Sequence, residues 1–61
     1  MRHRELIEHL RLHGCEILRE GGRHTVYVNP ANGRKAAVPR HKEIKTPTAR
    51  EIAKALGIPL P

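Results

Sequence analysis

The sequence predicts a small α+β domain in the order α-β-β-β-α, with two helices on one face of a three-stranded antiparallel sheet. Three observations favour this fold. Amphipathic patterns occur near both ends of the chain, three short strand patterns lie between them, and turns of a few residues containing glycine separate the strands. Strands joined by such short turns run antiparallel, and two amphipathic helices can cover one sheet face. The 61 residues are expected to form a single domain, residues 1–61.

The first predicted helix has Leu6, Ile7 and Leu10 on one side at helical spacing, with charged residues elsewhere around its surface. Gly14 is the type of residue that commonly adopts the left-handed conformation at a helix end. We therefore expect this helix to stop near His13.

Three strand patterns follow the first helix. The first covers residues 15–19 and ends at a pair of glycines. The second, His24–Val28, is the clearest because it is rich in β-branched residues and contains the single tyrosine. The third, residues 35–38, follows Asn32-Gly33, a pair that favours the positive φ values of a tight hairpin. The three strands are expected to form a meander.

The last predicted element is a helix with apolar residues at i, i+3, i+4 and i+7, starting from Ala49. Two starts are compatible with the sequence. Thr46 would be the cap with Pro47 at the first helical position, or Thr48 would be the cap with a glutamate three positions later. Gly57 is expected to end the helix.

The composition limits the functional classes. Twelve Lys and Arg against six Asp and Glu give a net charge of +6, which suggests a polyanionic partner such as RNA or an acidic protein. With one Tyr and no Trp or Phe, the core must be thin. No apolar run approaches the ~20 residues of a membrane span, and the amphipathic start is unlike a secretory signal. We therefore expect a cytoplasmic location and no membrane partner.

Five histidines raise the possibility of a metal site. His9 and His13 are four positions apart on the first predicted helix and could share one ion. The third ligand would have to be Glu16, His24 or His41, and no known metal-binding motif supports that set. The alternative is that the helical histidines are partly exposed surface residues, and we expect neither a metal nor another cofactor.

Cys15 is the lone cysteine, which excludes an internal disulfide and a four-cysteine zinc site. A catalytic cysteine needs a lowered pKa and a nearby base, and nothing in the sequence identifies one. We expect Cys15 to be a small buried residue of the core.

Gly21-Gly22-Arg23-His24 leads into the second strand and contains the parts needed to cleave RNA. Glycines allow the backbone to approach a phosphate closely. Histidine can exchange protons near neutral pH and so take the proton of a ribose 2′-hydroxyl, while Arg23 could bind the phosphate. The alternative is that His24 is a solvated residue at the end of a strand.

A cluster of basic residues surrounds the third strand and the loop after it. Clusters of this kind contact the phosphate backbone of nucleic acids, although many are simply solvated surfaces. Tyr27 is the only aromatic residue available for base stacking, so backbone recognition fits better than stacking. The cluster consists of Arg34, Lys35, Arg40, His41, Lys42 and Lys45.

Four stretches occur in an order and at spacings typical of one known family. They are a leucine-containing helix ending at Gly14, a Gly-x-His-x-hydrophobic-Tyr stretch at Gly22–Tyr27, a Val-Pro-x-His segment at Val38–His41, and a terminal helix within residues 48–58. Together they cover nearly the whole chain. The chain resembles the HicA-type mRNA interferase toxins of prokaryotic toxin–antitoxin modules.

The resemblance implies a fold like that of double-stranded-RNA-binding domains, ribosome-independent RNA cleavage, and neutralisation by a cognate HicB-type antitoxin. It also implies that the family's catalytic histidine corresponds to His24. The chain departs from the family pattern at two positions. Arg23 replaces the usual small polar residue before the histidine, and Cys15 replaces the usual aromatic residue after Gly14.

The leading hypothesis is therefore a type II toxin that cleaves mRNA without a metal ion. His24 would act as general acid/base, and RNA phosphates would be bound by Arg23, Lys35, Arg40, His41 and Lys42. The alternative is a non-catalytic RNA-binding module of the same fold, in which His24 has no special role. A third hypothesis is a structural domain that binds an acidic protein.

Overall fold

A computed structural model describes residues 1–61 and confirms the α+β fold with the predicted order of elements. The three strands form one antiparallel sheet in the order β1-β2-β3. The elements are α1 (His3–Leu12), β1 (Glu16–Glu20), β2 (His24–Asn29), β3 (Arg34–Pro39) and α2 (Thr46–Leu56).

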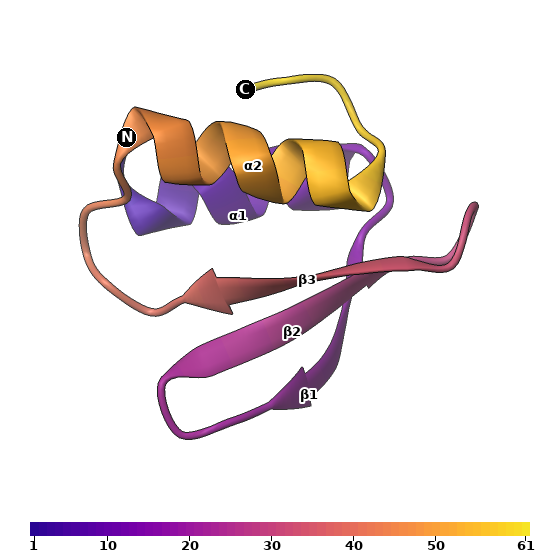
Figure 1. Ribbon diagram of the computed structural model, residues 1–61, viewed down its shortest axis with the longest axis horizontal. Helices are drawn as coiled ribbons and strands as arrows, with labels where there is room; N and C mark the ends of the chain where they lie inside the picture. Colours follow the sequence, from indigo (N-terminus) through magenta and orange to yellow (C-terminus); the bar gives the residue numbers. More distant parts are fainter.

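Both helices lie over the same face of the sheet (Figure 1). One hydrophobic cluster joins the two layers, and nine buried residues form it. Leu6 and Leu10 come from α1, and Tyr27 comes from the centre of β2. The remaining members are Cys15, Val38, Ile44, Ala49, Ile52 and Leu56.

The alternation of β2 decides which side chains face the helices. Thr25, Tyr27 and Asn29 are buried beneath the helices, so His24 lies on the opposite face of the sheet. Asn29 also ties the sheet to α2, because its side-chain amide donates a 2.9 Å hydrogen bond to the carbonyl of Leu56. The face that carries His24 is not covered by either helix (Figure 1).

Several expected turns and helix ends are observed. Gly14, which follows the C-cap residue His13 of α1, has a φ of 82°, and Gly57 ends α2 with a φ of 69°. In the β2–β3 connection only Gly33 has a positive φ, so residues 30–33 form a longer turn than a two-residue hairpin. Neither of the two predicted N-cap residues of α2, Thr46 and Thr48, is the cap in the structure. Lys45 caps the helix through its backbone, with Pro47 in the first turn as expected.

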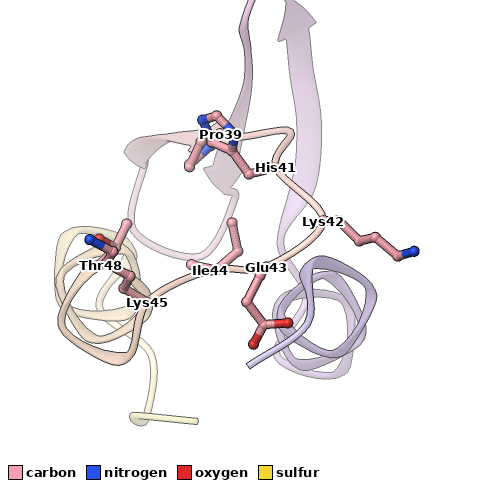
Figure 2. A pocket seen from close by; sticks show the side chains of 7 residues that line it. All are labelled: Pro39, His41, Lys42, Glu43, Ile44, Lys45 and Thr48. Atoms are coloured by element: carbon pink, nitrogen blue, oxygen red, sulfur yellow. The ribbon is translucent and has the colours of Figure 1, made fainter.

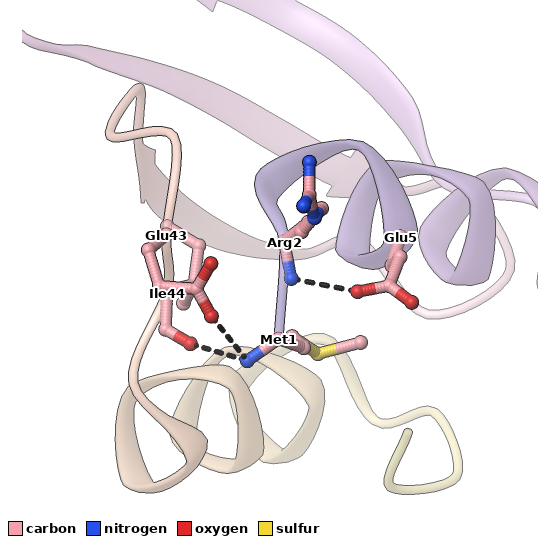
Figure 3. A network of polar contacts seen from close by, with 5 residues as sticks. All are labelled: Met1, Arg2, Glu5, Glu43 and Ile44. Atoms are coloured by element: carbon pink, nitrogen blue, oxygen red, sulfur yellow. Dashed lines mark hydrogen bonds and ion pairs between the residues drawn. The ribbon is translucent and has the colours of Figure 1, made fainter.

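The first residues pair with the loop that precedes α2 (Figure 3). Met1 and Ile44 exchange two hydrogen bonds of 2.8 Å between their main-chain nitrogen and carbonyl groups, and the amide of His3 donates to the carbonyl of Lys42 at 2.9 Å. This pairing places the beginning of α1 beside residues 42–44. No helix of the structure is long and apolar enough to cross a membrane.

Candidate RNA-cleavage site

His24 is the first residue of β2, and its side chain is exposed. Its backbone pairs with Pro39 of β3, so the start of β2 lies beside the end of β3. An open cavity of about 510 Å³ is lined by residues from these two strand ends and from the adjoining turn. Those residues are Gly22, Arg23, His24, Arg40 and His41.

The guanidinium of Arg40 holds the turn between β1 and β2. It donates hydrogen bonds of 2.5 and 2.6 Å to the carbonyls of Gly21 and Gly22, and one of 3.1 Å to the hydroxyl of Thr25. Gly21 in turn donates its amide to the carbonyl of His24 at 2.8 Å. These contacts fix the backbone on both sides of His24, so Arg40 is a positioning residue of the cavity.

His41 lies between two neighbouring cavities and lines both of them. It lines the cavity of His24 and also a neighbouring cavity of about 530 Å³ between the end of β3 and the start of α2 (Figure 2). Lys42 lines this second cavity but not that of His24, and Figure 2 shows its side chain extending away from the loop. His41 and Lys42 therefore extend the cationic surface beyond the turn.

Lys35 lies at the opposite end of β3 from the cavity. It pairs with Val28, whereas Pro39 pairs with His24, so Lys35 lies about 13 Å further along the strand at ~3.3 Å per residue. The alternation of the paired strands puts Lys35 on the same uncovered face as His24. The structure therefore does not bring Lys35 into the cavity, and any contact with RNA would be a distant one.

His9 of α1 and His13, which follows that helix, have partners within the protein. The Nε2 of His9 is 2.7 Å from the carbonyl oxygen of Pro59, and the rings of His9 and His13 pack edge to face with centroids 4.7 Å apart. No group of three histidine, cysteine or acidic side chains comes together in a way that could hold a metal ion.

Two basic residues near this surface were not singled out from the sequence. Arg2 and Arg4 line a crevice together with Arg40 and His41, because the pairing of Met1 with Ile44 brings the start of α1 to the loop. The sequence shows that both residues are basic. It does not show that they lie near the loop, because that depends on main-chain pairing between segments far apart in the chain.

A comparison with family models identifies the chain. The model described as the HicA toxin of bacterial toxin-antitoxin matches residues 3–58 of the 61-residue chain. The chain belongs to the HicA toxin family. HicA toxins belong to toxin–antitoxin systems and are known for RNase-type activity, and membership implies an antitoxin partner. No curated protein and no solved structure matches the chain.

The two positions that depart from the HicA pattern have different surroundings. Cys15 is 4% exposed and belongs to the core cluster, as expected from the sequence. Burial raises the pKa of its thiol, which lowers the thiolate fraction at neutral pH. Arg23 is exposed and lines the cavity of His24. The first departure therefore affects the core of this HicA chain, and the second affects its candidate site.

Cys15 is expected to be chemically inert in the folded protein. At neutral pH iodoacetamide should alkylate it far more slowly than in the urea-unfolded chain, because the thiol is both buried and mostly protonated. The raised pKa of the folded state also predicts that the free energy of unfolding falls as the pH rises above about 8.5. Mass spectrometry measures the alkylation, and equal rates in the folded and unfolded proteins would contradict this account.

Proposed function

We propose that this protein is an endoribonuclease that cleaves mRNA without a metal ion, with His24 as the general acid/base. The exposed position of His24 in an open, cationic cavity is the observation that carries the proposal. A buried imidazole would have no access to a ribose, whereas this side chain lies at the surface close to Gly21 and Gly22. RNA as substrate also agrees with the net charge of +6. We also propose that the protein acts in the cytoplasm.

The proposed chemistry requires few groups. The imidazole of His24 takes the proton of a ribose 2′-hydroxyl, and the 2′ oxygen attacks the adjacent phosphorus. The bond from phosphorus to the 5′ oxygen breaks, and that oxygen leaves with a proton taken from water. The products are a 2′,3′-cyclic phosphate and a free 5′-hydroxyl. Stabilisation of the charge on the phosphorane is assigned to the guanidinium of Arg23, which lines the same cavity.

The remaining phosphate contacts are assigned to residues that flank the cavity. His41 and Lys42 extend the surface along the loop, and Lys35 would contact RNA further along the uncovered sheet face. Arg40 has five N–H groups, and its two hydrogen bonds to the turn and one to Thr25 of β2 leave some of them free for a phosphate oxygen. Its assigned role therefore combines positioning of the turn with binding of RNA.

Replacement of the proposed general base gives the direct test. His24→Ala should reduce RNA cleavage by about 10²–10⁴-fold, the usual contribution of general acid–base catalysis, and should abolish growth inhibition. The melting temperature should hardly change, because the side chain is exposed and does not belong to the core cluster. Cleavage of a long RNA at neutral pH, followed on a denaturing gel, measures the effect.

Controls separate this proposal from its alternatives. His13→Ala removes a partly exposed histidine that lies outside the cavity, and it should cleave at the wild-type rate. Cleavage should survive EDTA. Loss of cleavage in EDTA that is restored by adding one metal ion would contradict metal independence.

Full activity of His24→Ala would refute the catalytic role of His24. If the wild-type protein leaves RNA uncleaved but shifts it on a gel in a salt-sensitive way, the non-catalytic RNA-binding module is favoured instead.

We further propose that the antitoxin partner is an acidic protein of the HicB type that covers the cationic cavity. The cavity contains two arginines and two histidines but no acidic residue. Opposite charge steers association and fixes the orientation of partners. Exposed apolar side chains at the end of α1 and on β1, namely Leu12, Ile17 and Leu18, offer further area that such a partner could bury.

Mixing the protein with the acidic product of a neighbouring reading frame tests this partner. The complex should not cleave RNA, and its association rate should fall as the salt concentration rises, because screening weakens attraction between surface charges. A complex that still cleaves RNA, or one whose association rate is independent of salt, would contradict occlusion of the cavity by an acidic protein.

A further inference from the structure

A second crevice, which we call the cationic crevice, continues from the cavity of His24 toward the start of α1. Its volume is about 330 Å³, and none of its lining residues is acidic or apolar. It shares two lining residues with the cavity of His24, so the two form one continuous basic tract. The crevice is lined by Arg2, His3, Arg4, Arg40, His41 and Lys42.

The crevice is built by main-chain pairing between distant parts of the chain. Arg2 forms a β-bridge with Glu43, and the amide of His3 donates to the carbonyl of Lys42 at 2.9 Å. These bonds hold the first turn of α1 against the loop before α2, as Figure 3 shows for Met1 and Ile44. The cationic side chains on the two segments are therefore brought together in the free protein and need no ligand to assemble them.

Glu5 and Glu43, which flank Arg2 in the structure, do not pair with its guanidinium. Glu43 pairs with the amino group of Met1 at 3.4 Å, which is the only ion pair in the structure. Glu5 accepts a 2.7 Å hydrogen bond from the backbone amide of Arg2 rather than from its guanidinium. Figure 3 shows the Arg2 side chain directed away from both carboxylates. The guanidinium groups of Arg2 and Arg4 therefore have no acidic partner, and a bound anion would reduce their mutual repulsion.

One polar atom of the crevice is also unsatisfied. The Nε2 of His3 is buried and has no hydrogen-bond partner, and it is the only buried side-chain nitrogen or oxygen in this condition. A buried polar atom without a partner destabilises the protein. An acceptor or donor that enters the crevice and reaches this nitrogen after a small movement of the ring would remove that cost.

We propose that the cationic crevice binds a backbone phosphate of the same RNA strand whose scissile phosphate lies in the cavity of His24. This subsite rests on the proposed function. It adds to it the path of the RNA over the surface, which runs from the start of β2 past His41 to the start of α1. An RNA strand fits better than a compact anion because the two hollows share residues and carry positive charge along their whole length. Arginine also matches a phosphate with two parallel N–H donors.

The test measures binding of a short single-stranded RNA in which every 2′-hydroxyl is methylated, so that the wild-type protein cannot cleave it. Arg2→Ala combined with Arg4→Ala should raise its Kd about tenfold and reduce the slope of log affinity against log salt by about 0.7, the value for one phosphate. Arg2→Lys with Arg4→Lys should retain most of the affinity. On cleavable RNA the alanine pair should raise KM and leave kcat within about twofold, because Arg2 and Arg4 do not line the cavity of His24.

A matched control removes the same charge from a different surface. Arg50→Ala with Lys54→Ala alters two exposed basic residues on α2 that line neither hollow. Equal losses of RNA affinity in the two alanine pairs would overturn the subsite and leave the proposed function intact. Unchanged RNA binding with weakened binding of the acidic antitoxin would assign the crevice to the protein partner and would also overturn it. A wild-type protein that neither binds nor cleaves RNA would refute the proposed function itself.

Discussion

Three hydrogen bonds from the guanidinium of Arg40 hold together the segment that carries the candidate site. They reach the carbonyls of Gly21 and Gly22 and the hydroxyl of Thr25, from a residue that directly follows β3. Two glycines in succession would otherwise leave the turn before β2 free to move. The exposed imidazole of His24 therefore lies at the start of β2, next to a turn that Arg40 restrains. The proposed catalysis depends on this restraint, because general acid–base chemistry requires a fixed distance between the base and its proton.

The position of the core explains why so small a chain can leave a whole sheet face open for the proposed RNA substrate. Both helices pack on one face of the sheet (Figure 1). The buried apolar side chains of the helices and the sheet form a single cluster. The other face carries the side chains of His24 and Lys35, which the core does not need. The site and the hydrophobic core therefore occupy opposite sides of the sheet, and a substitution such as His24→Ala can be studied without disturbing the fold.

Much of the fold was predictable because it depends on local patterns. The apolar spacing in both helices, the β-branched residues of β2 and the helix end at Gly14 each act within a few residues, and the structure confirms them. The prediction that Thr46 or Thr48 caps α2 was wrong, because no side chain caps this helix. The helix begins from the extended backbone of Lys45, whose carbonyl accepts a 3.0 Å hydrogen bond from Ala49.

The candidate site was predictable in its residues and less so in their arrangement. Arg23, His24, Arg40 and His41 were expected from motif and charge, and they line one cavity. Lys35 was expected by charge alone and lies at the far end of β3. The positioning contacts of Arg40 and the joining of Met1 to Ile44 arise between segments distant in sequence, and neither leaves a periodic signal. Such contacts follow from the tertiary structure and were therefore missed.

The central claim is that Arg40 holds the turn that presents His24, and amide hydrogen exchange at Gly21 tests it most directly. Gly21 donates its amide to the carbonyl of His24 at 2.8 Å, so its exchange rate reports on opening of the turn. In Arg40→Ala we predict that Gly21 exchanges about tenfold faster, while the amide of the buried Leu10 is unchanged, and that RNA cleavage slows in parallel. Exchange at Gly21 and a cleavage rate that both equal the wild-type values would contradict the account.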